Sequence, residues 1–169
     1  ISRHYPKLLE IDELPERALA FIKAVGEAQA KLIAKWMSFG FIHGVMNTDN
    51  YSVGGFTIDF GPCAFMDEFK NSKVFSSIDR KARYSYKNQT EIGQWNLLRL
   101  AECLIPLIDK NQELAVSKLE EMLDPVLENF KSKRWELMAP KFGITNYQAS
   151  DQQLMSDFLS YLEDEELDF

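Results

Sequence analysis

Two short segments of the chain gather side chains that could bind a metal ion and accept a proton. The first covers residues 43–50 and reads His43-Gly44-Val45-Met46-Asn47-Thr48-Asp49-Asn50. The second is the triplet Asp59-Phe60-Gly61. Amide and carboxylate oxygens are hard ligands that suit Mg²⁺ or Mn²⁺, and a carboxylate beside a metal can take a proton from a hydroxyl nucleophile. Asp49, Asn50 and Asp59 are therefore the candidate site residues.

A β-hairpin is predicted around Gly54-Gly55, because this pair separates two short segments with alternating apolar and polar residues, 51–53 and 56–58. In this register position 50 lies opposite position 59, with Cα atoms about 4.5–5.5 Å apart. We therefore expect Asn50 and Asp59 to meet at the open end of the hairpin as one metal site. The alternative is that these two residues only close the hairpin by hydrogen bonds.

The spacing of residues 43–50 matches the catalytic loop of kinases, which reads His-Arg-Asp in protein kinases and often His-Gly-Asp in small-molecule kinases of the same fold, but the position of the base Asp differs. Kinases place the base Asp five residues before a metal-binding Asn, and a second metal ligand follows in an Asp-Phe-Gly triplet. Here that position holds Val45, whose side chain cannot accept a proton. Asp49 is the replacement base, with a turn-capping role as the alternative. His43 is expected to hydrogen-bond loop backbone rather than to act as a base.

The elements that must position these residues are mostly helices. Apolar residues recur at three- and four-residue steps after Pro15, which predicts a helix of about 20 residues that ends near Gly40. Residues 60–90 are expected to form a long structured loop. Further helices are expected after Gly93, with Pro106 kinking or closing that helix, and over residues 111–123, 125–138 and 150–163. The predicted class is mainly α with a small β-hairpin, in a single domain over residues 1–169.

Composition argues against several classes of function. The net charge is −7, so the surface would repel phosphate backbones and nucleic acid is not an expected partner. No apolar run approaches the roughly 20 residues of a membrane span. The only cysteines are Cys63 and Cys103 and the only histidines are His4 and His43, which gives no zinc pattern. Two reduced thiols are typical of a cytosolic protein.

Two blocks of sequence, in the same order, resemble the selenoprotein O (YdiU) family. The first block is Phe41-x-His43-Gly44-Val45-Met46-Asn47-Thr48-Asp49-Asn50, then Thr57-Ile58-Asp59-Phe60-Gly61-Pro62 and Phe65-Met66-Asp67. The second is Arg83-Tyr84-x-Tyr86-x-Asn88-Gln89, then Trp95-Asn96-Leu97-x-Arg99-Leu100-Ala101. In addition, Arg3-His4-Tyr5-Pro6 resembles the start of that family's C-terminal half.

The resemblance implies a protein-kinase-like fold that binds ATP in a flipped orientation. Enzymes of this family transfer AMP from ATP to Ser, Thr or Tyr hydroxyls of protein substrates and release pyrophosphate. It also implies that Asp49 is the base, and that Asn50 and Asp59 bind Mg²⁺ or Mn²⁺ together with the nucleotide. The implied location is the cytoplasm in a bacterium, or the mitochondrion in a eukaryote.

The chain departs from the family pattern before His43, where only Gly26 and Gly40 occur and no glycine-rich loop is found. The resemblance therefore implies the C-terminal lobe of a kinase-like enzyme without its N-terminal lobe, and we expect this chain alone to bind ATP weakly and to transfer AMP negligibly. Two alternatives remain. A kinase-like phosphotransferase is disfavoured by Val45, and a non-catalytic pseudokinase or helical binding module is disfavoured by the presence of Asp49, Asn50 and Asp59 together.

Overall fold

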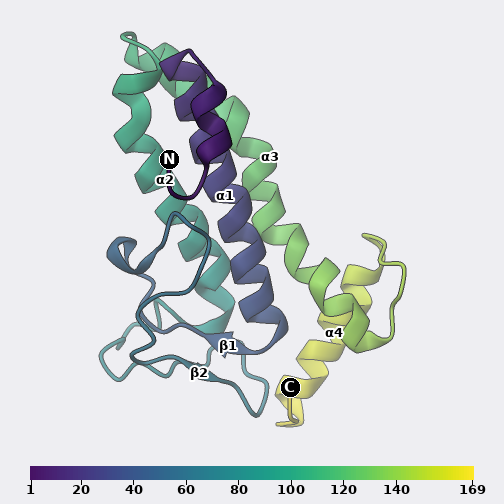
Figure 1. Cartoon of the computed structure of the whole chain (residues 1–169). Helices are drawn as coiled ribbons and strands as arrows, with labels where there is room; N and C mark the ends of the chain where they lie inside the picture. Colours follow the sequence, from purple (N-terminus) through teal and green to yellow (C-terminus); the bar gives the residue numbers. More distant parts are fainter.

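Helices account for most of the computed structural model, which describes residues 1–169 (Figure 1). The mainly α class expected from the sequence is confirmed. The α-helices are α1 (Leu14–Ser38), α2 (Gln89–Ile108), α3 (Gln112–Met138) and α4 (Asp151–Asp164). Short 3-10 helices cover Pro6–Glu10 (η1), Thr48–Asn50 (η2), Tyr86–Asn88 (η3) and Ala139–Phe142 (η4). Two strands of two residues each, β1 (Phe41–Ile42) and β2 (Ala64–Phe65), complete the structure.

Helix α1 lies between α2 and α3 and packs against both (Figure 1). Its buried side chains, including Ile22 and Ile33, recur on the apolar face that the sequence pattern predicts. Gly26 lets the three helices approach closely, because a Cβ there would lie 2.5 Å from Val126 Cγ1 and 2.8 Å from Leu97 Cδ2. The helix ends at Ser38, and Gly40 follows with φ +68.

The predicted hairpin around Gly54-Gly55 is wrong. Residues 51–59 form no strand, and the backbone N–H of Gly55 donates to the carbonyl of Ser52 (3.2 Å), so the turn lies one residue earlier than expected. Polar groups on α1 compete with the cross-strand bonds. The Gln29 amide donates to the Ser52 carbonyl, and the Trp36 indole N–H donates to Thr57 Oγ1 over 3.0 Å. Residues 51–59 therefore bond to helix α1, and no strand pairs form within the segment.

The sheet that does form pairs β1 with β2 antiparallel, with Phe41 opposite Phe65 and Ile42 opposite Ala64. It joins the start of the candidate catalytic segment to the region just after Asp59-Phe60-Gly61. The long loop expected over residues 60–90 is confirmed as far as Asn88, with β2 and η3 inside it, and α2 begins at Gln89.

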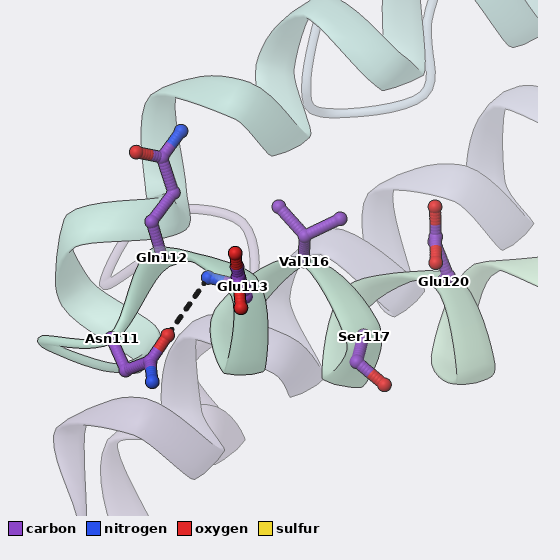
Figure 2. Close-up of a pocket in the computed structure, with 6 residues that line it drawn as sticks. All are labelled: Asn111, Gln112, Glu113, Val116, Ser117 and Glu120. Carbon is purple, nitrogen blue, oxygen red and sulfur yellow. Dashed lines mark hydrogen bonds between the residues drawn. The ribbon is translucent and has the colours of Figure 1, made fainter.

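Helix α3 is one continuous helix, so the predicted break at Asp124-Pro125 is wrong. Pro125 removes one backbone hydrogen bond, but Leu123, Val126 and Phe130 are buried in the core on either side of it. Burial of that face outweighs the local cost, because packing supplies most helical stability. Asn111 caps the helix: its side-chain oxygen accepts from the backbone N–H groups of Glu113 (3.0 Å) and Leu114 (3.3 Å), and Figure 2 shows the first of these bonds.

Helix α2 begins at Gln89, before Gly93, and continues through Pro106 to Ile108, so Pro106 lies close to its end. Helix α4 agrees with the expected range to within one residue. Beyond it the chain returns to the long loop, where Phe69 N–H donates to the Leu167 carbonyl (2.9 Å) and Phe169 N–H donates to the Asp67 carbonyl (2.8 Å). None of the helices combines the length and the apolar character that crossing a membrane requires.

Candidate metal and proton-transfer site

The candidate catalytic segment leaves β1 at Ile42 and turns sharply toward solvent. Gly44 adopts φ +82 and lies against Pro62, whose Cγ and O atoms would both be 3.1 Å from a Cβ at that position. Met46 is buried and anchors the segment, and Asn96 of α2 donates its side-chain amide to the Met46 carbonyl over 3.0 Å. Residues 48–50 then form η2, so Asp49 lies in an exposed turn that follows the buried, hydrogen-bonded Met46.

His43 is completely buried and holds the two candidate segments together. Its Nε2 atom lies 2.7 Å from the carbonyl oxygen of Ile58, so Nε2 carries the proton, and Nδ1 then accepts the longer bond from Val45 N–H (3.4 Å). The backbone N–H of His43 donates to Gln89 Oε1 over 3.0 Å. With both ring nitrogens engaged by backbone, His43 is a structural residue, as its position in the kinase frame predicted.

Asn50 is oriented by the same short segment. Its amide Nδ2 donates to the carbonyl of Val45 over 3.1 Å, which fixes the side chain and leaves Oδ1 without a protein donor. Because His43 also holds Ile58, the residue before Asp59, both predicted metal ligands are tied to residues 43–45. No hydrogen bond joins Asn50 to Asp59, so they do not close a hairpin in the way the alternative interpretation required.

Asp59 presents an exposed carboxylate on a constrained backbone. Its φ of +55 is uncommon for a residue with a side chain, although Asp tolerates it better than most. No protein donor or cation binds the carboxylate, and Oδ1 folds back to 3.3 Å from where a Cβ on Gly61 would be. The carboxylate of Asp49 is likewise exposed and has no protein partner.

The side chains of Asp49, Asn50 and Asp59 are chemically suited to a hard divalent cation. The donors without partners are an amide oxygen and two carboxylates, which are the groups that Mg²⁺ and Mn²⁺ prefer. No three His, Cys, Asp or Glu side chains converge to form a metal cage of their own. Mg²⁺ is commonly held by one or two carboxylates while water and substrate phosphates complete its shell, so a sparse protein set suits a site that is completed by a nucleotide.

Two buried polar residues of the second sequence block (residues 83–101), Tyr86 and Gln89, bond to backbone on either side of the start of the catalytic segment. Tyr86 is fully buried and donates its hydroxyl to the Met37 carbonyl over 2.7 Å. Burial raises the pKa of Tyr86 to about 12, with the nearby Arg134 guanidinium acting in the opposite direction. Gln89 links Phe41 and His43 through its amide, because its Nε2 donates to the Phe41 carbonyl (2.9 Å). Gln89 thus fixes the start of the catalytic segment, and Tyr86 fixes the end of α1 that leads into it.

A cleft beside Val45 is the feature that sequence reasoning missed. It has a volume of about 380 Å³ and is lined by Val45 and Asn47 on one wall and by the loop 76–84 on the other. The hydroxyl of Tyr84 donates to the Asn47 side chain and joins the two walls. The mixed charges at residues 79–83 were the only signal in the sequence, and nothing local indicated which segment they would approach.

Comparison with known proteins places the whole chain in one family. The sequence model of the family described as "Protein adenylyltransferase SelO" matches residues 1–169. The chain is 47% identical to the protein nucleotidyltransferase YdiU of Rhizobium rhizogenes and 49% identical to that of Rhizobium etli, in each case over 100% of this chain and 33% of the relative. It is 45% identical to the same protein of Pseudoalteromonas translucida, over 100% of this chain and 36% of the relative. The chain thus spans about a third of the length of the curated relatives it matches.

Proposed function

The chain belongs to the protein adenylyltransferase SelO family, and from this premise we propose that it carries the metal-binding and proton-accepting part of an enzyme that transfers AMP from ATP to protein hydroxyls. The acceptors are Ser, Thr or Tyr side chains. Asp49 is the base, and Asn50 and Asp59 hold Mg²⁺ or Mn²⁺. The proposed fold around them is the C-terminal lobe of a protein-kinase-like enzyme.

The observation that carries this proposal is the common anchoring of Asn50 and Asp59. The first bonds Val45, and the second follows Ile58, which is bonded by His43. Two ligands anchored by hydrogen bonds to the same short segment, residues 43–45, keep a fixed relation to each other, as a metal site for phosphate chemistry requires. The exposed Asp49 lies in the same turn as Asn50, one residue away.

The proposed reaction is a displacement at the α-phosphorus of ATP. A bond forms between the acceptor oxygen and that phosphorus, the bond to the β-phosphate bridging oxygen breaks, and pyrophosphate leaves with the bonding electrons. Asp49 accepts the proton of the acceptor hydroxyl. A bound divalent cation would neutralise phosphate charge in this site. Val45 offers no second proton acceptor at the usual kinase position, so the base role rests on Asp49.

The nucleotide clamp is proposed to come from parts of a longer protein. Within residues 1–42 there is no glycine-rich loop that could cradle phosphates, and the relatives are about three times as long as this chain. We therefore propose that the chain alone binds ATP weakly and transfers AMP negligibly. The relatives are bacterial proteins, and the proposed reaction takes place in the cytoplasm, or in the mitochondrion of a eukaryote, where ATP is available.

The test uses ATP labelled at the α- or the γ-phosphate, with a longer protein that contains this chain and a mixture of candidate protein substrates. AMP transfer places the α-label on protein and leaves the γ-label in pyrophosphate. Asp59→Ala should abolish the labelling, whereas Asp164→Ala, a change of an exposed carboxylate in α4, should leave it unchanged. Transfer of the γ-label would identify a phosphotransferase instead, and no label from either position would favour a binding module.

A further inference from the structure

Three cationic side chains line the cleft beside the catalytic segment: Arg80, Lys81 and Arg83. All three are exposed, and none is engaged in an ion pair. The chain as a whole has a net charge of −7, so this is a positive site on an acidic protein. Unpaired cations that converge on one cleft raise the local concentration of an anionic ligand.

The loop that carries these cations is held in one conformation. The Asp79 carboxylate accepts from the backbone N–H groups of Arg83 (2.9 Å) and Tyr84 (2.8 Å), which closes a tight turn in which Ala82 has φ +53. The guanidinium of Arg83 stacks on Trp95 of α2, with 4.9 Å between its Cζ atom and the ring centroid. Because the turn is already formed, ligand binding should cost little entropy for ordering this loop.

The cleft is joined directly to the turn that carries Asp49. Tyr84 donates its hydroxyl to the Asn47 side chain, and the Asn47 carbonyl accepts the backbone N–H of Asn50 at 3.0 Å. Asn47 itself lines the cleft. A ligand in this cleft therefore lies beside the turn that carries the proposed base.

We propose that this cleft binds an acidic segment of the protein substrate, next to the hydroxyl that receives AMP. This inference rests on the proposed function and names the substrate class for the same site. A nucleotide phosphate fits the cleft less well, because the backbone N–H groups of Arg83 and Tyr84, which could otherwise bind a phosphate, are already taken by Asp79. The exposed Ile78 on the rim adds apolar contact that suits a peptide.

Binding of labelled peptides to the protein tests this inference without any need for AMP transfer. One fluorescein-labelled peptide carries a single Tyr flanked by Glu residues, and its partner carries Gln in place of every Glu. Fluorescence anisotropy at low ionic strength should show that the acidic peptide binds more tightly, and added salt should weaken it. Arg80→Gln combined with Lys81→Gln should weaken the acidic peptide about tenfold, the equivalent of 1.4 kcal/mol.

The control removes the same charge elsewhere: Lys23→Gln with Lys31→Gln, two exposed lysines of α1, should leave peptide binding unchanged. Equal binding of the two peptides, no binding of either, or equal losses in both double variants would overturn the inference. Displacement of the acidic peptide by tripolyphosphate at equal concentration would identify a phosphate site and also overturn it. Binding of the acidic peptide by a longer protein that contains this chain, combined with no AMP transfer by that same protein, would support the peptide site and refute the proposed function alone.

Discussion

The Nε2 atom of His43 donates a hydrogen bond of 2.7 Å to the carbonyl oxygen of Ile58, and this bond connects the candidate catalytic segment to the residue before Asp59. The imidazole has no exposed surface, so water cannot replace the bond if it is lost. The ring also accepts from Val45 N–H, and the Val45 carbonyl accepts from Asn50. One buried ring thus underlies the positions of both proposed metal ligands.

Replacement of His43 should therefore cost stability and metal binding together. His43→Phe keeps an aromatic ring at this position but leaves the part-buried Ile58 carbonyl without this donor, which should lower the free energy of unfolding by about 1–3 kcal/mol. Urea unfolding of this chain measures the change, and Mn²⁺ binding in the presence of ATP should weaken as well in a longer protein that contains it. His4→Phe is the matched control, because His4 is exposed and makes no side-chain hydrogen bond. Equal unfolding midpoints for the two variants would contradict the role assigned to His43.

Asp59→Asn should separate metal binding from folding. The Asp59 carboxylate has no protein partner, and Asn adopts the positive φ at this position as readily as Asp. The free energy of unfolding should therefore change by less than about 0.5 kcal/mol. In a longer protein that contains this chain, Mn²⁺ binding in the presence of ATP, followed by electron paramagnetic resonance, should weaken about tenfold or more, the equivalent of losing at least 1.4 kcal/mol.

The control for that measurement is Asp164→Asn, which removes one exposed carboxylate from α4. It should alter neither the Mn²⁺ signal nor the urea midpoint. If both variants bind Mn²⁺ as the unmodified protein does, Asp59 is not a ligand and the proposed site is wrong.

The helices were predictable because their signals are local. Apolar residues on the face of α1 that carries Ile22 and Ile33 repeat every three or four residues. This pattern indicates a helix regardless of which other segments pack against it. The hairpin around Gly54-Gly55 failed for the opposite reason. Gln29 and Trp36, far away in the sequence, bond to Ser52 and Thr57. A local pattern does not reveal such competitors.

The candidate site divides in the same way. Asn50 and Asp59 could be proposed from spacing, because the kinase frame specifies positions along the chain. Asp49 was proposed as a replacement base next to Asn50, because the frame's own base position holds Val45. The residues that hold them in place could be predicted only in part: a hydrogen bond from His43 to loop backbone was expected, but its partner, the Ile58 carbonyl, was not. The cleft formed by residues 76–84 was missed, because it depends on a side-chain bond from Tyr84 to Asn47 across the fold.

Gly93 should resist substitution because three elements meet there. A Cβ at this position would collide with Ile33 Cδ1 of α1 and would lie 2.9 Å from Phe130 Cε1 of α3 and 3.0 Å from the Tyr51 hydroxyl. In an exposed helix Ala would be more stable than Gly by about 1 kcal/mol. In Gly93→Ala, however, the steric overlap in the core should dominate and lower the free energy of unfolding by about 1–3 kcal/mol. Urea unfolding measures the change. Glu91→Ala, an exposed position in the same helix, is the control and should stay within about 0.5 kcal/mol.

Tyr86 should make the stability of the protein fall in alkali. Its pKa is about 12 in the folded protein because burial disfavours the phenolate, whereas an unfolded tyrosine ionises near its ordinary value of 10. The unfolded state therefore loses its proton first as the pH rises. The stabilisation from a neutral Tyr86 is complete below pH 10 and is lost progressively as the pH rises toward 12, with a slope of at most about 1.4 kcal/mol per pH unit.

Tyr86→Phe should remove that part of the slope. At pH 8 the variant should be less stable by about 0.5–1.5 kcal/mol, because the hydrogen bond to the Met37 carbonyl is lost. The difference should shrink between pH 10 and 12, since only the unmodified protein loses the contribution of Tyr86. Tyr161→Phe changes an exposed tyrosine and should keep the full slope. Urea unfolding at several pH values measures all three proteins, and parallel curves for Tyr86→Phe and the unmodified protein would show that ionisation of Tyr86 is not coupled to folding.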